Sequence, residues 1–85
     1  MSEDKYVNIN IDFSKFSKGK FDVRVPVYLT LKEILQIIEE ALQVKLDLVN
    51  PVARVLQTGK VIQSLTTLQE AGEAKNGLTL FVEER

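Results

Sequence analysis

Acidic side chains are the groups in this sequence that could carry acid/base or metal chemistry. Glu39 stands beside Glu40, and Asp12 and Asp22 lie in neighbouring apolar stretches, so either pair could in principle hold a proton or a hard cation. A solvated surface is the favoured interpretation, because adjacent carboxylates are usual on the polar side of a helix. Histidine and cysteine are absent, which excludes His-assisted nucleophiles and thiolate zinc sites. We therefore expect no enzymatic activity, no metal site and no cofactor.

Basic residues provide two further candidates. The segment "TGKVI" at residues 58–62 contains a glycine–lysine pair, but it lacks the spaced glycines and the Ser or Thr of a phosphate loop, which favours a turn. Lys15, Lys18 and Lys20 could contact an acidic partner, with a solubilising loop as the favoured alternative. The net charge of −1 and the pI of about 5.4 give no overall positive field, so we expect no nucleic acid partner.

Composition indicates a small globular protein with a packed core. Hydrophobic residues make up 45% and charged residues 27% of the 85 positions, which favours one domain over residues 1–85, with residues 1–5 flexible. No segment approaches the ~20 apolar residues of a membrane span, and the first residues lack the pattern of a signal peptide. We expect a cytoplasmic protein without membrane insertion, and the absence of cysteine fits a reducing compartment.

The first half of the chain predicts a hairpin followed by a helix. Apolar and polar residues alternate in residues 6–13 and 21–25, with Gly19 in the turn between them and Pro26 ending the second strand. Thr30 and Glu33 have the spacing of a capping box, which predicts that a helix begins there. Seven apolar residues share one arc of this helix and are expected to be buried: Leu31, Ile34, Leu35, Ile37, Ile38, Ala41 and Leu42.

The second half predicts more strands around one short helical turn. Strands are expected at residues 52–57, 61–62 and 78–82, and Thr67 with Glu70 forms a second capping box before Gly72. Alternation in the last strand turns three residues inward (Leu78, Leu80 and Val82) and two outward (Thr79 and Phe81). The order of elements predicts an α+β fold of the β-grasp type, in which one main helix packs on one face of a mixed sheet.

Two stretches resemble known ubiquitin-like proteins. The segment "RVLQTGKVIQSLTTLQEAG" is similar to the second half of ubiquitin, and "IDFSKFSKGKFDVRVPVYLTLKEIL" resembles the YukD/EsaB family of small bacterial ubiquitin-like proteins associated with type VII secretion systems of Gram-positive bacteria. The resemblance implies a cytoplasmic accessory or regulatory component that contacts the protein components of the secretion machinery. One departure follows Gly72, where relatives commonly place an aliphatic residue. Here Glu73 and Ala74 follow, and Ala74 is expected to fill that core position poorly.

The end of the sequence bears on conjugation. An ubiquitin-like modifier or sulfur carrier needs a terminal diglycine that enters an adenylating enzyme, whereas this sequence has Glu83-Glu84-Arg85. We therefore expect a non-conjugated protein that acts through a binding surface. An adaptor of another assembly is the first alternative, and a carboxyl-terminally activated modifier or sulfur carrier is the second.

The face of the sheet opposite the helix is the expected contact surface. By the ubiquitin-like register, Leu56 falls at the central isoleucine of ubiquitin's recognition patch and Phe81 lies close to the neighbouring valine. Apolar residues within a polar frame are typical of interaction sites, although a register error could place either residue inside. The expected site comprises Tyr6, Asn8, Asn10, Arg24, Leu56, Thr79 and Phe81, with the Lys15, Lys18 and Lys20 hairpin as a second surface.

Overall fold

A computed structural model describes residues 5–85. Residues 1–5 were expected to be flexible, and residues 1–4 lie outside the described residues. The carbonyl of Lys5 accepts a hydrogen bond from the Val27 N–H. The elements in chain order are β1 (Tyr6–Asp12), a 3-10 turn (Ser14–Phe16), β2 (Lys20–Pro26), α1 (Leu31–Leu42), β3 (Pro51–Val55), β4 (Val61–Ile62), α2 (Leu68–Ala71) and β5 (Leu78–Glu84).

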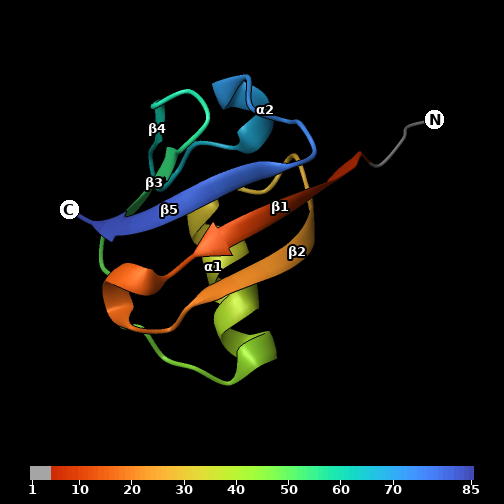
Figure 1. Cartoon of the computed structure of the whole chain (residues 1–85). Coiled ribbons are helices and arrows are strands. Elements are labelled where there is room, and N and C mark those ends of the chain that lie inside the picture. The colour runs from red at the N-terminus through yellow and green to blue at the C-terminus, as the bar shows by residue number, and fades with distance from the viewer. Residues whose placement is uncertain (1–4) are drawn as a thin grey trace.

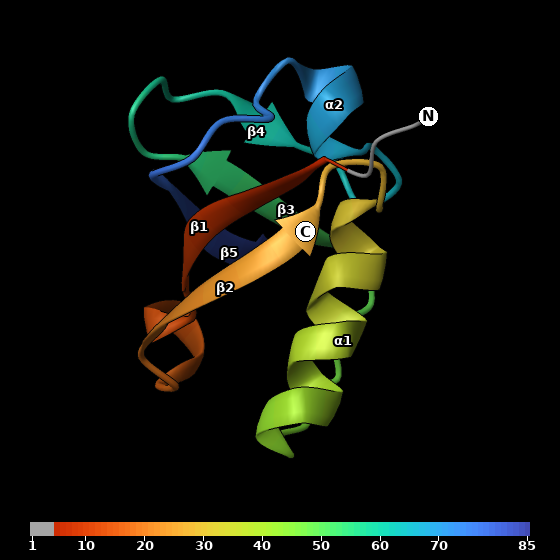
Figure 2. The same cartoon turned by 90° about the vertical axis from the view of Figure 1, so that its right-hand side faces the viewer.

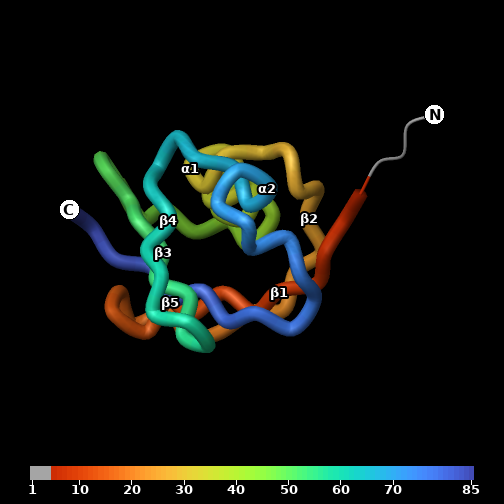
Figure 3. Tube along the Cα trace, turned by 90° about the horizontal axis from the view of Figure 1, so that it is seen from above, coloured from red at the N-terminus to blue at the C-terminus, as the bar shows by residue number. Residues whose placement is uncertain are grey.

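The five strands form one mixed sheet in the order β2-β1-β5-β3-β4. β1 pairs antiparallel with β2 and parallel with β5, and β3 pairs antiparallel with β5 and β4. The strands lie in front of α1 in Figure 1 and beside it in Figure 2. Seen from above, α1 and α2 lie on the same side of the sheet (Figure 3), so the predicted β-grasp arrangement is confirmed.

Both predicted capping boxes are formed. The Thr30 hydroxyl accepts the Glu33 N–H at 3.2 Å, while the Glu33 carboxylate accepts the Thr30 N–H at 2.9 Å. Thr67 and Glu70 repeat this exchange at α2. The first-turn N–H groups of a helix have no partner within it, so these side chains fix where each helix begins. Gly72 ends α2 in the left-handed region at φ 76°, as the sequence predicted.

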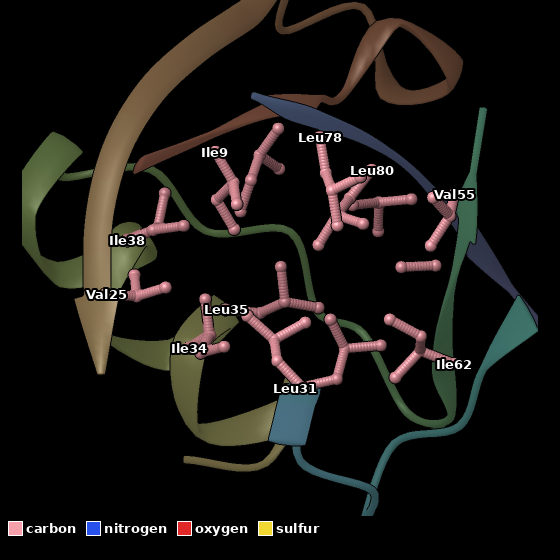
Figure 4. Packing of buried hydrophobic residues seen from close by; sticks show 14 of the residues in the cluster. Ile9, Val25, Leu31, Ile34, Leu35, Ile38, Val55, Ile62, Leu78 and Leu80 are labelled. Carbon is pink, nitrogen blue, oxygen red and sulfur yellow. The ribbon is translucent and has the colours of Figure 1, made fainter. Parts of the chain in front are cut away.

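The core lies between α1 and the sheet (Figure 4). Ile9 and Leu80 project from neighbouring strands toward Ile34 and Leu35 of the helix, and all four side chains are buried. The alternation predicted for residues 6–13 and 78–82 places every apolar residue after Tyr6 on its inward side in the core: Val7, Ile9, Ile11, Phe13, Leu78, Leu80 and Val82. Each buried side chain of this size stabilises the fold by about 1.5–3 kcal/mol relative to exposure, which makes this layer the main source of stability.

The predicted burial of α1 is correct for four of its seven arc residues. Leu31, Ile34, Leu35 and Ile38 are buried, whereas Ile37 and Leu42 are 49% and 38% exposed and Ala41 is exposed. An arc of seven residues is wider than the contact that one sheet offers. The last turn of α1 also extends beyond the strands in Figure 1, so its apolar residues have no strand beneath them.

Two further differences concern acidic residues. Asp12, expected to point outward, is 5% exposed, because its carboxylate turns back to the 3-10 turn. After Gly72 the core position is taken by Glu73, which is also 5% exposed, and Ala74 is exposed. The Oε1 atom of Glu73 is buried without a hydrogen-bond partner among residues 5–85. β3 ends at Val55, two residues before the predicted end.

Candidate protein-binding face of the sheet

The face opposite α1 has no other element on it within residues 5–85 (Figure 3). Strand register places its side chains in rows across the sheet. Asn8 lies opposite Arg24, Asn10 is flanked by Asp22 and Thr79, and Phe81 is flanked by Asp12 and Arg54. All of these but Asp12 are half-buried or exposed. The alternation of the strands therefore places Asn8, Asn10, Arg24, Thr79 and Phe81 on one face.

An apolar group occupies the end of this face over β3 and β5. The Leu56 N–H donates to the Thr79 carbonyl at 3.0 Å, which continues the β3–β5 pairing past Val55. The Leu56 side chain is 53% exposed, and Thr79 and Phe81 are half-buried. Leu56 and Phe81 form a small hydrophobic surface together with the methyl-bearing side chain of Thr79. These three residues are called the apolar group below. A patch of this kind within polar surroundings is suited to protein contact.

Gln57 fixes the position of the apolar group. Its amide oxygen accepts the Thr79 N–H at 3.0 Å, and its amide nitrogen donates to the Gly77 carbonyl at 3.2 Å. The Gln57 side chain therefore makes the backbone hydrogen bonds that a further residue of β3 would make to the strand beside it. The sequence did not indicate this role, because no local pattern shows that an amide will pair with a strand twenty residues away.

The other end of the face is polar. The Arg24 guanidinium lies 5.3 Å from the centre of the Tyr6 ring, a cation–π arrangement. The Asn10 amide donates to the Asp22 carboxylate at 3.0 Å. A shallow hollow of about 570 Å³ lies between the strands there, lined by Asn8, Ile9, Asn10, Asp22, Val23, Arg24, Gly77 and Leu78. Gly77, at φ 89°, contributes no side chain, which leaves the hollow open.

The predicted site residues form two end groups, Tyr6 with Arg24 and the apolar group, which Asn8 and Asn10 join. Tyr6 pairs with Pro26 at one end of β1, whereas Phe81 lies beside Asp12 at the other. Six residues of extended strand separate the two positions, a span of about 20 Å. A partner that contacts both groups must therefore cover the whole face.

Ion pairs border the apolar group. Glu83 lies 3.1 Å from the Arg54 guanidinium and 3.7 Å from the Lys15 ammonium. Lys15 thus contacts the sheet, while Lys18 and Lys20 are exposed around the hairpin. Exposed pairs of this kind contribute about 0.2–1 kcal/mol to stability, so their main effect is to order the border of the face.

The final residues of β5 are fixed to the start of β3. The Glu84 carboxylate accepts the N–H groups of Val49 at 3.1 Å and Asn50 at 2.6 Å. The Arg85 N–H donates to the Asn50 carbonyl at 3.1 Å. These contacts hold residues 84 and 85 against the sheet.

Asp12 orders the hairpin below the apolar group. Hydrogen bonds from the hydroxyl and the N–H of Ser14 hold the pKa of Asp12 below its ordinary value of 3.8, the positive charge of Lys20 lowers the pKa further, and burial opposes both. The N–H bond measures 2.8 Å. The ionised carboxylate is therefore the form that the fold stabilises.

Replacing Asp12 with Asn is expected to lower the free energy of unfolding near neutral pH by about 1 kcal/mol, because hydrogen bonds to a charged acceptor are stronger than those to a neutral one. The folded-state pKa is depressed, so the stabilisation is complete above the ordinary pKa and is lost as pH falls through the folded value. Urea unfolding should show a difference from wild type that disappears in acid. Glu40→Gln, at an exposed carboxylate of α1, is the control, and an equal difference at all pH values would contradict the prediction.

One acidic candidate, Glu39, has a structural contact. Within residues 5–85 no group of three or more acidic side chains could hold a metal ion. The Glu39 carboxylate instead accepts the Leu46 N–H at 3.2 Å, which supports the segment after α1. In the same residues no helix combines the length and apolar character that crossing a membrane requires.

No family model matches the sequence. The type VII secretion system accessory factor EsaB of Staphylococcus aureus strains Newman and COL is 26% identical over 58 residues, which cover 68% of this chain and 72% of EsaB. The C-terminal ubiquitin-like domain of mouse tubulin-specific chaperone e superposes with a TM-score of 0.67 at 18% identity, covering 100% of this chain and 92% of that domain. A ubiquitin-like domain from tubulin-binding cofactor B gives a TM-score of 0.64 at 11% identity, over 94% and 90% of the two chains.

The solved structures establish the fold alone, since fold does not imply function. The sequence relative is described as an accessory factor and the solved neighbours as ubiquitin-like domains, and none of these descriptions is that of an enzyme. The chain has a ubiquitin-like β-grasp fold and is similar in sequence to the EsaB accessory factors of type VII secretion.

Proposed function

We propose that this chain, as one ubiquitin-like domain over residues 1–85, is a non-conjugated accessory or regulatory protein of a bacterial type VII secretion system. It acts by contact with protein components of the machinery and catalyses no reaction. The similarity to EsaB carries the proposal, because it spans about two thirds of both chains. A cytoplasmic location is part of the proposal and is tested by cell fractionation.

The apolar group is the proposed centre of the contact. Leu56 and Phe81 lie on paired backbone, and the Gln57 side chain forms hydrogen bonds with the backbone of Gly77 and Thr79 beside them. Little conformational entropy is therefore lost when these residues bind a partner. Arg54, Asn10 and Glu83 lie beside this centre and carry groups that can form hydrogen bonds. Interfaces commonly combine an apolar centre with a polar rim.

The hairpin is the proposed second contact. Lys18 and Lys20 are exposed, and Ser17 at φ 61° and Gly19 at φ 84° shape the loop that presents them. The charges suit an acidic segment of the same partner. Because Lys15 pairs with Glu83 at the border of the apolar group, the hairpin and the sheet face are continuous.

A role without conjugation is part of the proposal. In this role Glu83 and Glu84 keep their contacts with the sheet. A modifier or sulfur carrier is the alternative from another class. Intact mass after incubation with ATP and cell extract separates the two, because conjugation or thiocarboxylation changes the mass and docking does not.

Replacing Leu56 and Phe81 together with Glu is expected to abolish capture of secretion-machine components from detergent-solubilised membranes and lysate. Two carboxylates in an apolar contact would lose their hydration without gaining a partner. Wild type and variant are compared as bait at equal concentration, and thermal melts confirm that both are folded.

A matched control places the same charge elsewhere. Leu65 and Tyr28 are 75% and 55% exposed and lie outside the proposed contact, so Leu65→Glu with Tyr28→Glu should leave capture unchanged. Capture by wild type and by both double variants would move the contact away from the sheet face. If wild type captures no secretion component, an adaptor role in another assembly becomes the better explanation.

A further inference from the structure

β2 is an edge of the sheet with one free side. It pairs with β1 over all seven of its residues and is the terminal strand of the sheet. In Figure 2 it lies at the near side of the sheet. An edge strand presents unpaired N–H and C=O groups, which can pair with a strand from another chain.

The contacts of Asn8 show which backbone groups face this free side. The Asn8 N–H donates to the Asn76 side chain at 2.8 Å, and the Asn8 carbonyl accepts the Gly77 N–H at 2.8 Å, so both groups point to β5. Arg24 lies opposite Asn8. Hydrogen-bonded and non-hydrogen-bonded pairs alternate in an antiparallel ladder, so the N–H and C=O of Arg24 and of Asp22 point to the free side.

The side chains of Asp22 and Arg24 are exposed and already oriented. Asn10 holds the Asp22 carboxylate, and Arg24 lies over the Tyr6 ring. Neither charge belongs to an ion pair with any residue from 5 to 85. On the helix side of the same strand, Phe21 and Val23 are only half-buried. The edge therefore carries two opposite charges on one face and incompletely covered apolar side chains on the other.

We propose that two copies of this chain associate through antiparallel β2 strands centred on Val23, which joins their sheets. This register places Asp22 of each copy opposite Arg24 of the other. Centring on Asp22 would instead oppose two Asp22 carboxylates, and centring on Arg24 would oppose two Arg24 guanidinium groups. Like charges directly opposite are destabilising and opposite charges are favourable, so the charge pattern favours the register centred on Val23 over these two.

The same register covers the apolar side of the edge. Val23 meets Val23 of the second copy, and Phe21 meets Val25. The symmetric contact uses the β2 edge of both copies, so association by this route stops at a dimer. A contact confined to one short strand is smaller than a standard interface, so the dimer should form and dissociate with protein concentration.

Charge exchange tests the register directly. In sedimentation velocity, the wild type is expected to shift from monomer to dimer as concentration rises. Asp22→Arg and Arg24→Asp each oppose like charges and should lose the shift. The double variant Asp22→Arg/Arg24→Asp restores opposite pairs and should regain it. Lys75→Glu, an exposed charge reversal away from the edge, should dimerise as the wild type does.

Amide hydrogen exchange provides a second measurement. The N–H groups of Asp22 and Arg24 should exchange rapidly at low concentration and slowly at high concentration, while that of Val23, which faces β1, stays protected in both. A wild type that remains monomeric over the whole range would overturn the proposal. Single variants that dimerise normally, or a double variant that does not regain association, would overturn it as well.

Discussion

Leu80→Glu is expected to unfold the protein or reduce its free energy of unfolding by several kcal/mol. Leu80 is 0% exposed, pairs with Ile11 and Val55 in the middle of the sheet and faces α1. A carboxylate there would be buried without a partner, which is among the largest single-residue costs known. Circular dichroism with thermal and urea melts measures the loss.

Thr79→Glu is the matched control for this change. Thr79 is adjacent in β5 but lies on the opposite face, where it is half-buried. The control is expected to remain folded with a stability change within about 1 kcal/mol, because a surface carboxylate keeps its hydration. Equal losses from both variants would contradict the assignment of the two faces of the sheet.

Glu73→Leu is expected to stabilise the protein by about 1–3 kcal/mol, the range of costs for leaving a buried polar group unpaired. Glu73 is 5% exposed, and its Oε1 has no hydrogen-bond partner within the described chain. An aliphatic side chain would fill the same space without that cost. For a domain of this size each kcal/mol raises the Tm by about 4–8 °C, so the gain is measurable by thermal melting.

Two controls separate burial from charge in this position. Glu73→Gln keeps the shape and a polar group, so it should gain less than Glu73→Leu. Ala74→Leu changes an exposed neighbour and should have little effect on stability. If Glu73→Leu lowered the Tm, the carboxylate would be making a stabilising contact, and the assignment of this position to the core would be wrong.

Local signals in the sequence predicted most of the fold. Thr30 and Glu33 determine the start of α1 through hydrogen bonds within one turn, which a short motif can specify. Alternation correctly separated inward from outward residues in β5 and, apart from Asp12, in β1, because a strand has a period of two. The exposed Ile37 could not be predicted in this way, since its burial depends on how far the sheet extends beneath the helix.

Side-chain hydrogen bonds and the path of the backbone account for the other differences. Asp12 turns inward because Ser14 is available to its carboxylate, and Gln57 pairs with Thr79 of β5. No periodicity reveals such partners. Glu73 is buried because Gly72, the residue before it, ends α2 in the left-handed region. The backbone then directs the next side chain inward whatever its chemistry. Burial predicted from the spacing of apolar residues therefore does not identify a buried carboxylate.

The candidate site could be predicted only in part for the same reason. Alternation shows that Thr79 and Phe81 share a face, but their position relative to Leu56 depends on the pairing of β3 with β5, and that register came from the ubiquitin resemblance. The separation of Tyr6 and Arg24 from the apolar group depends on the register of β1 with β2 and β5, which alternation alone does not determine. The use of this face for binding remains a prediction.

Secretion by living cells tests the central claim most directly. A strain that lacks the gene is complemented with the wild type, with Leu56→Glu/Phe81→Glu or with Leu65→Glu/Tyr28→Glu, and type VII substrates are quantified in the medium at equal levels of the three proteins. We expect the wild type and the Leu65/Tyr28 variant to restore secretion and the Leu56/Phe81 variant to fail. Normal secretion without the gene, or full restoration by the Leu56/Phe81 variant, would contradict the account.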